Sequence, residues 1–419
     1  MTADVENASR GLCPRIAVTG VGVVSAAGAG VDQCFESLLS GRHLLCDLGQ
    51  AWAAPPHNLG AAAGDFDARE WIPPRRLRRI NGLSRMALVA GIQALRQSGM
   101  ESGPQTGVVI GTGLGALADT VEFIGQLLDE DPSLANPALF PATVMNVAAS
   151  QISIELGLQG FNTTVSHKEI SGELALMIAV QALRLGRADG ILCGGVDELS
   201  RATHHGYRRL GGLASGVARP YRRGRDGVVL GEGAALLLIE QTDGARARGG
   251  TILAEVAGVG AAGGDRPLVA WGPTIESGRK VGPALEAGVE AATRALEHAG
   301  LDPEEIDLVI GQGCGSRDLD RLEAQVLQRV FAGRAVPVTS PHGTLGTWMA
   351  SGSLRLATAV EVLRSGRIYP TVTGGELDPD VPVAGLVTDT REASVGTVLV
   401  CGHAAGGGSC AVVLAKGEG

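Results

Sequence analysis

Two stretches of this sequence, SGELALMIAVQALRLGR at residues 171–187 and SGSLRLATAVEVLRSGR at residues 351–367, are versions of one pattern. They lie 180 positions apart and carry the same residue at ten of 17 positions. Both space their apolar residues as a helix does, and both reach a glycine near the end, where helices commonly stop. The pair therefore predicts two equivalent apolar helices packed in the middle of the protein.

A shorter pair of repeats precedes these helices. VVIGTG at 108–113 and LVIGQG at 308–313 share the frame V-I-G-x-G, and RIAVTGVGVV at 15–24 also reads as a buried strand that enters a glycine turn. A strand, a turn and an apolar helix that occur twice indicate a duplicated β/α unit, with mostly parallel strands buried on both faces. We expect an α/β fold of two similar halves, residues 1–249 and 250–419, packed as one compact unit.

The composition excludes several classes of protein. Of the 419 residues, 45% are hydrophobic, 3% are aromatic and 63 are glycine, which is typical of a folded α/β protein and not of a disordered chain. The net charge of -9 argues against a nucleic-acid surface, and no apolar run reaches the ~18 residues of a membrane span. We therefore expect a cytoplasmic protein whose partners include neither nucleic acid nor a membrane.

Three local patterns suggest cofactor or metal sites but favour simpler interpretations. The seven cysteines lack a C-x-x-C spacing, which indicates reduced thiols and no zinc site. Gly258–Gly263 matches the dinucleotide pattern G-x-G-x-x-G, yet the chain continues into Asp265-Arg-Pro instead of opening a helix. The adjacent His204 and His205 cannot share one face of a strand and are predicted to lie in a surface loop. No cofactor and no metal are expected.

Several short motifs, taken together, resemble one known family. They are VTGVGVVS at 18–25, NTTVS at 162–166 followed by Ser171-Gly172, Gly194-Gly195, Arg219-Pro220, RDGVVLGEG at 225–233, and Glu323 with Val330-Phe331. The chain resembles the β-ketoacyl-carrier-protein synthases of fatty acid and type II polyketide assembly over nearly its whole length. The resemblance implies the thiolase fold, a duplicated αβαβα layered sandwich with two pseudo-symmetric halves.

The resemblance also locates four positions at which the family carries its condensing residues. Glu169 stands at the position of the nucleophilic Cys, and Cys314 stands at that of the first active-site His. His342 occupies the position of the family's Lys, and Thr347 that of its second His. A carboxylate cannot hold an acyl chain as a thioester, so we expect that the chain is not a competent condensing enzyme alone.

Substrate contacts are implied by the same resemblance. Ser316 replaces one of the threonines that hold the pantetheine arm, and Glu323 lies in a family motif further on. The family gates its acyl pocket with a G-F-G-G loop, and the run here, Cys401 to Cys410, keeps glycines but has no Phe. His403 and Gly407 are the candidate substrate-binding residues of that run.

Three roles for Glu169 stay open at this point. The first makes the chain a chain-length factor, the noncondensing partner of a homologous ketosynthase in type II polyketide or polyene assembly, in a heterodimer or a homodimer. The second is an enzyme that uses Glu169 beside His342, and Cys314, as an acid or base to decarboxylate, dehydrate or cyclise an acyl chain. In the third, Glu169 simply caps a helix N-terminus.

An acyl carrier protein is the other expected partner. Two arginine-rich segments, residues 75–79 and 219–225, would suit an acidic carrier protein, although solvated helix faces explain them as well.

Overall fold

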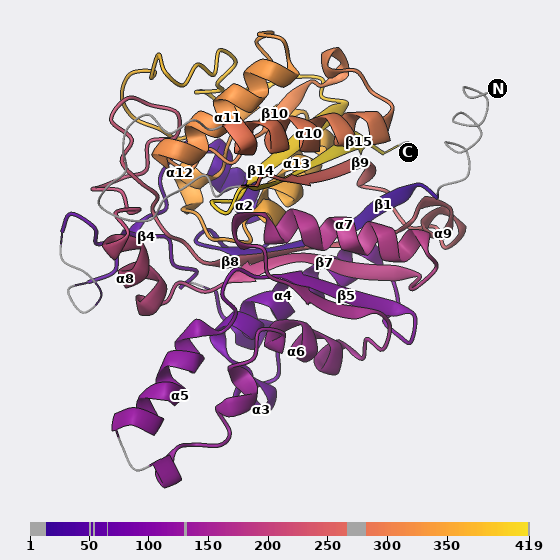
Figure 1. The fold of residues 1–419 in the computed structure, drawn as a ribbon. Coiled ribbons are helices and arrows are strands. Elements are labelled where there is room, and N and C mark those ends of the chain that lie inside the picture. Colours follow the sequence, from indigo (N-terminus) through magenta and orange to yellow (C-terminus); the bar gives the residue numbers. More distant parts are fainter. Residues whose placement is uncertain are drawn as a thin grey trace.

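The computed structural model describes residues 14–49, 52, 55–64, 66–129, 132–265 and 282–417, and Figure 1 shows its ribbon. The main sheet consists of β1 (Ile16–Ser25), β2 (Gly28–Ala29), β5 (Thr106–Gly111), β6 (Asn162–Val165), β7 (Gly190–Asp197), β8 (Gly233–Gln241), β9 (Ala254–Gly263), β10 (Leu308–Ile310), β11 (Val338–Thr339), β14 (Thr397–His403) and β15 (Gly408–Lys416). Two small ribbons pair β3 (Cys46–Asp47) with β4 (Leu59–Gly60) and β12 (Arg367–Ile368) with β13 (Arg391–Glu392).

The helices of the described chain lie on both faces of this sheet. They are α2 (Val31–Leu39), α3 (Pro74–Leu77), α4 (Gly82–Ser98), α5 (Leu117–Asp129), α6 (Val147–Leu156), α7 (Ser171–Arg184), α8 (Arg201–Arg209), α9 (Thr242–Ala247), α10 (Gly282–Ala299), α11 (Arg317–Val330), α12 (His342–Leu345) and α13 (Gly352–Ser365).

The strand order shows the duplication directly. It runs β11-β10-β14-β15-β9-β1-β8-β7-β5-β6, so that each strand of one half has a counterpart at the mirrored place in the other. The two halves meet where β1 pairs with β9, at Ile16–Val18. The expected boundary at Gly249–Gly250 falls between α9 and β9 and stays a prediction.

The expectation of mostly parallel strands is wrong. β5 pairs in parallel with β6 and β7, and β10 pairs in parallel with β11 and β14, but every pairing from β7 through β8, β1, β9 and β15 to β14 is antiparallel. The central strands are nevertheless buried on both faces, as expected, because helices cover each side.

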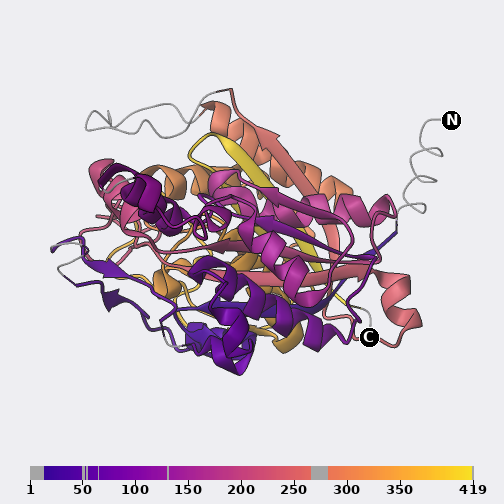
Figure 2. The same ribbon diagram turned by 90° about the horizontal axis from the view of Figure 1, so that it is seen from below.

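Five layers follow from this arrangement. α4 and α6 cover the outer face of the N-terminal strands, α10 and α11 cover that of the C-terminal strands, and α7 and α13 lie between the two sets (Figure 1). Seen from below, the indigo and purple helices of one outer layer lie over the strands (Figure 2). The protein thus has the predicted αβαβα architecture.

The two repeated helices lie where the sequence placed them, at the centre of the largest hydrophobic core. α13 ends at Gly366, which adopts a left-handed conformation with φ of 68°, and Gly186 has the same conformation just beyond α7. One detail of β1 differs from expectation: Gly20 and Gly22 lie inside the strand and not in a turn. A Cβ at either would come within 2.0 Å of a carbonyl oxygen of α4, so glycine allows the helix to pack on the strand.

Candidate functional site

The turn between β6 and α7 presents Glu169. A short 3-10 helix (Lys168–Ile170) precedes α7, and Lys168 takes a left-handed conformation with φ of 52°. The Ser171 hydroxyl fixes this turn, because it accepts the N–H of His167 at 2.8 Å and donates to the carbonyl of Lys168 at 2.7 Å. The sequence-predicted nucleophile position therefore stands at the head of the buried helix.

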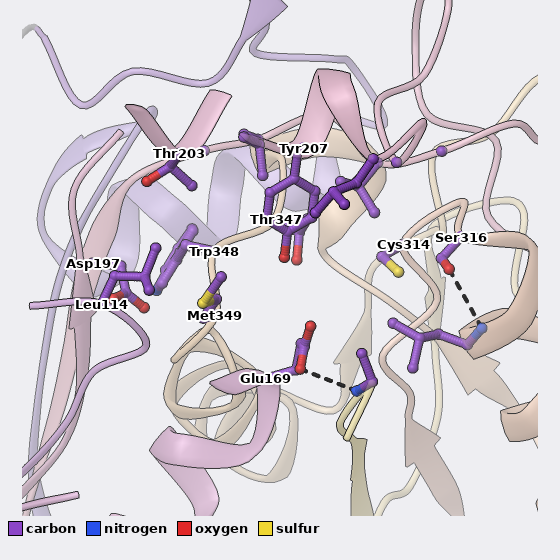
Figure 3. A pocket seen from close by; sticks show the side chains of 18 of the residues that line it. Leu114, Glu169, Asp197, Thr203, Tyr207, Cys314, Ser316, Thr347, Trp348 and Met349 are labelled. Carbon is purple, nitrogen blue, oxygen red and sulfur yellow. Dashed lines mark hydrogen bonds between the residues drawn. The ribbon is translucent and has the colours of Figure 1, made fainter. Parts of the chain in front are cut away.

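Glu169 opens onto a pocket of about 1120 Å³, a volume that includes part of its open mouth. The walls are largely apolar and include Leu114, Leu117, Leu199, Leu210, Val228, Leu230, Leu319, Trp348 and Met349. A second hollow, which Lys168 and Gly406 line, shares Glu169 and Tyr207 with the first. The two hollows therefore adjoin at these residues, and Figure 3 shows Glu169 among the side chains that line the pocket.

The carboxyl group of Glu169 accepts the N–H of Ala405 at 3.2 Å, from the turn between β14 and β15. Burial raises the pKa of Glu169, and the Ala405 N–H only partly offsets this effect. The N-cap of α7 is Ile170, whose side chain makes no capping hydrogen bond, and the helix-capping role of Glu169 stays a prediction. The carboxyl group bridges the two halves of the protein.

Cys314 also lines the pocket, but its thiol is unsuited to nucleophilic chemistry. The residue is 2% exposed, and its sulfur lies 3.7 Å from a carboxylate oxygen of Asp320. Burial, with the charge of Asp320, raises the pKa of the Cys314 thiol well above its ordinary value. The thiol form therefore predominates at neutral pH.

His342 is buried and is not among the residues that line the described pocket. Its Nδ1 donates to the carbonyl of Gln312, and its Nε2 accepts the hydroxyl of Ser351 at 3.0 Å. Burial, with the positive charge of Arg355, lowers the pKa of His342 to about 3, so the ring is neutral. The lining of the described pocket holds Glu169 without His342, so the hypothesis that pairs them as acid and base gains no support from the pocket and stays a prediction.

Thr347 and Ser316 do line the pocket, as the resemblance implied. Figure 3 draws Thr347 and Ser316 among the side chains that line the pocket. The Ser316 hydroxyl accepts the N–H of Leu319 at 3.4 Å and so caps α11. Both hydroxyls are placed to contact a bound molecule.

Glu323 does not line the described pocket, and its assignment to substrate binding stays a prediction. This carboxylate is fully buried, and it accepts the Tyr221 hydroxyl at 2.6 Å and the N–H groups of Gln312 and Gly313 at 2.6 and 2.9 Å. It shapes the loop that carries Cys314.

His403 and Gly407 are likewise absent from the described pocket lining, and their assignment to substrate binding stays a prediction. The N–H of His403 donates to the side chain of Gln312 at 2.8 Å, and its Nδ1 lies 3.0 Å from the Ser409 hydroxyl. Burial lowers the pKa of His403 to about 3. Gly407, with φ of 91°, forms the turn between β14 and β15. Ala405 and Gly406, in the same turn, are the residues of this run that line the two hollows.

Sequence reasoning missed three residues of the pocket. Asp197, at the carboxyl end of β7, accepts the N–H groups of Gly113 and Ala350 at 2.8 and 2.7 Å and so joins both halves. The next residue, Glu198, accepts the N–H of Ala118 at 2.7 Å, and burial raises the pKa of Glu198 to about 7. Tyr207 comes from α8. Only Asp197 could have been predicted from the sequence, because it lies at the end of a strand and strand ends commonly carry site residues in α/β proteins.

The remaining sequence patterns lie in a strand and a helix of the fold. Gly258–Gly263 lies within β9, where Gly258 and Gly260 pack against the backbone of α10. The predicted surface loop at His204 and His205 is wrong, since both lie on α8 and His204 is fully buried. In the described part of the chain, no cluster of three metal-ligating side chains occurs, and no helix is long and apolar enough to cross a membrane.

Comparisons with known proteins agree with this fold. Family models for the beta-ketoacyl synthase N-terminal and C-terminal domains match residues 14–245 and 272–374. The chain is 30% identical to the tetracenomycin polyketide synthase ketoacyl synthase alpha subunit of Streptomyces glaucescens, over 96% of this chain and 97% of that protein. It is 27% identical to 3-oxoacyl-[acyl-carrier-protein] synthase 2 of Coxiella burnetii, over 96% and 98% of the two chains.

A solved structure described as the ishigamide ketosynthase/chain length factor superposes with a TM-score of 0.88. It is 27% identical to this chain and covers 97% of it, and the match spans 100% of that chain. The two family models together span far more than half of the sequence. The chain belongs to the β-ketoacyl synthase family.

Proposed function

We propose that this chain is the noncondensing, chain-length-factor subunit of a heterodimer with a homologous ketosynthase in type II polyketide or polyene assembly. The observation that carries the proposal is the carboxyl group of Glu169 at the head of α7, where the family resemblance places the nucleophile. A carboxylate forms no thioester, and the pocket's only described thiol, Cys314, is held protonated by burial. The ketosynthase/chain length factor among the structural relatives supports the same role.

The surface supports a protein partner. Along one face of α5, Val121, Ile124 and Leu128 are 49%, 47% and 78% exposed. Phe140, Val144 and Met145, in the segment that follows, are also exposed apolar residues, and β6 is the edge strand of the sheet. Exposed apolar surface and an unpaired strand edge are features that subunit interfaces cover. The occupant that we propose is the homologous ketosynthase subunit.

An acyl carrier protein is the proposed second partner. Exposed arginines lie on α8, on the loop after it and at the start of α11, where Arg317 lines the pocket: Arg208, Arg209, Arg219 and Arg317. Together they would attract an acidic carrier protein. The rim could therefore serve a carrier protein that is bound mainly by the partner ketosynthase. A cytoplasmic location stays a prediction.

Co-expression with a Cys-containing homologous ketosynthase tests the proposal. We expect a stoichiometric complex that extends an acyl chain on a carrier protein, and no turnover by this chain alone. Replacing Glu169 with Gln should leave the activity of the complex within about threefold, since the group does no chemistry. Turnover of an acyl-carrier substrate by the isolated chain, abolished in Glu169→Gln, would instead establish the acid–base enzyme.

A further inference from the structure

The outer wall of the pocket is built from two helices that have few attachments to the rest of the protein. Thr203, Tyr207 and Leu210 of α8 line the pocket, and so does Leu117 at the start of α5. In the described structure α5 packs mainly on α8 and on two short 3-10 helices (Pro132–Leu134 and Phe140–Ala142). Figure 1 shows α5 extending away from the layered body.

The first turn of α5 is fixed by polar contacts. The N–H of Ala118 donates to Glu198 at 2.7 Å, and the amide of Asn81 donates to Asp119 at 2.8 Å. Just before the helix, Gly115 takes a left-handed conformation with φ of 64°. A glycine at such a position lets the following helix change direction.

Glu198 contributes both to the pocket lining and to the attachment of α5. Its side chain lines the pocket, it follows the carboxyl end of β7 directly, and it accepts the N–H of Ala118 in α5. The neighbouring Leu199 precedes α8, and its backbone N–H donates a hydrogen bond to the side chain of Glu232 at 3.0 Å. Two adjacent residues therefore connect the two wall helices to the sheet.

We propose that Glu198 is a positioning residue that holds α5 and α8 closed over the pocket, and that a subunit bound on the exposed face of α5 strengthens this closure. The second part rests on the proposed function, which supplies that subunit. The first part concerns the isolated chain alone. Loss of the Glu198 contact frees the first turn of α5, and the wall that Leu117 and Tyr207 form opens.

Alkylation of Cys314 measures the opening, because its thiol lines the pocket while Cys193 is buried within β7. The isolated chain is treated with N-ethylmaleimide, and modification of each cysteine is followed by peptide mass spectrometry. We expect Glu198→Ala to raise the Cys314 rate about tenfold, as loss of one hydrogen bond to a charged group allows. Glu198→Gln keeps an acceptor for Ala118 and should stay within about threefold of the parent.

Glu122→Ala is the matched control, since Glu122 lies exposed on the same helix and carries the same charge. It should leave the Cys314 rate unchanged, and Cys193 should stay unmodified in every variant. Equal Cys314 rates in the parent and in Glu198→Ala would overturn the proposal. So would parallel increases at Cys314 and Cys193, which report general unfolding.

The second arm adds the ketosynthase partner. Complex formation should slow alkylation of Cys314 in the parent about tenfold and restore slow alkylation in Glu198→Ala. A complex that forms without changing either rate overturns the coupling to α5. Failure to form any complex counts against the proposed function and leaves the first arm intact.

Discussion

The central helices α7 and α13 are copies, yet the protein uses them differently. The head of α7 presents Glu169 to an open pocket, whereas the space at the head of α13 is filled by a side chain of α7. Glu173, the third residue of α7, lies so close that a Cβ on Gly352 would be 1.7 Å from its carboxylate. Its equivalent in α13 is Ser353. The two halves therefore share one backbone arrangement, and a few side chains that differ between equivalent positions decide which half has a cavity at the head of its central helix.

The two helices α7 and α13 also differ in their charged residues. Glu173 pairs with Arg355 of α13 at 2.5 Å, and neither side chain is exposed. Arg355 stands where α7 has Ala175, and it also donates to the carbonyl of Cys401. The one ion pair that links the two helices therefore uses two positions at which the repeats disagree. Buried pairs cost desolvation, so its value lies in fixing how the halves meet.

Removing one member of this pair should give the largest effect. We expect Arg355→Met to lower the free energy of unfolding by roughly 3–5 kcal/mol, because it leaves the Glu173 charge buried without its partner. The double variant Glu173→Gln with Arg355→Met should recover ~2 kcal/mol of that loss. Urea denaturation of both variants measures the difference. Strictly additive effects of the two substitutions would show that the charges do not interact.

The repeated glycines of the V-I-G-x-G frame should give the next largest difference between the halves. A Cβ on Gly111 would lie 2.2 Å from the backbone carbonyl of Ser171, which cannot move without shifting α7. A Cβ on Gly311 would meet side-chain atoms instead, at 2.7 Å from Tyr221 and 2.8 Å from Glu323. We expect about 3 kcal/mol of destabilisation for Gly111→Ala and about 1 kcal/mol for Gly311→Ala. Equal unfolding midpoints for the two variants would contradict this.

The sequence predicted the features that depend on local pattern. The apolar spacing at 171–187 and 351–367 was enough to place both central helices, and the NTTVS motif was enough to place Glu169 at the head of one. It did not predict the antiparallel pairing of β7 with β8, because that depends on the return of the chain after α8. The spacing of apolar residues does not indicate which strand the returning chain pairs with, or in which direction.

Side-chain direction was the other limit on prediction. His342 and Thr347 are five positions apart, yet only Thr347 lines the described pocket. The ring of His342 turns away because Gln312 and Ser351 supply its hydrogen bonds, and both partners come from other segments. Asp197 and Tyr207 were missed for the same reason, since the site they complete is assembled from distant parts of the chain.

Buried His403 in the C-terminal half and buried Glu169 in the N-terminal half predict opposite pH responses. Burial lowers the pKa of His403 to about 3, below its ordinary 6.5, so the unfolded chain takes up a proton first as pH falls. Its contribution to stability is complete above pH ~6.5 and declines toward pH 3, by about 1.4 kcal/mol per pH unit. His403→Gln should flatten the fall in unfolding free energy between pH 6 and 4 by that amount. Parallel pH profiles for parent and variant would show that His403 is protonated in the folded state.

Glu169, at the head of α7, should show the smallest effect and the opposite sign. Burial raises the pKa of Glu169, so the contribution of this group to stability is complete at low pH and is lost as pH rises through its folded pKa. Glu169→Gln keeps an acceptor for the Ala405 N–H and removes the charge, and we expect a change within ~1 kcal/mol. The variant should gain on the parent between pH 5 and pH 8 in thermal unfolding. A parent that gains on the variant over that range would mean that the ionised carboxylate is stabilised at the helix head.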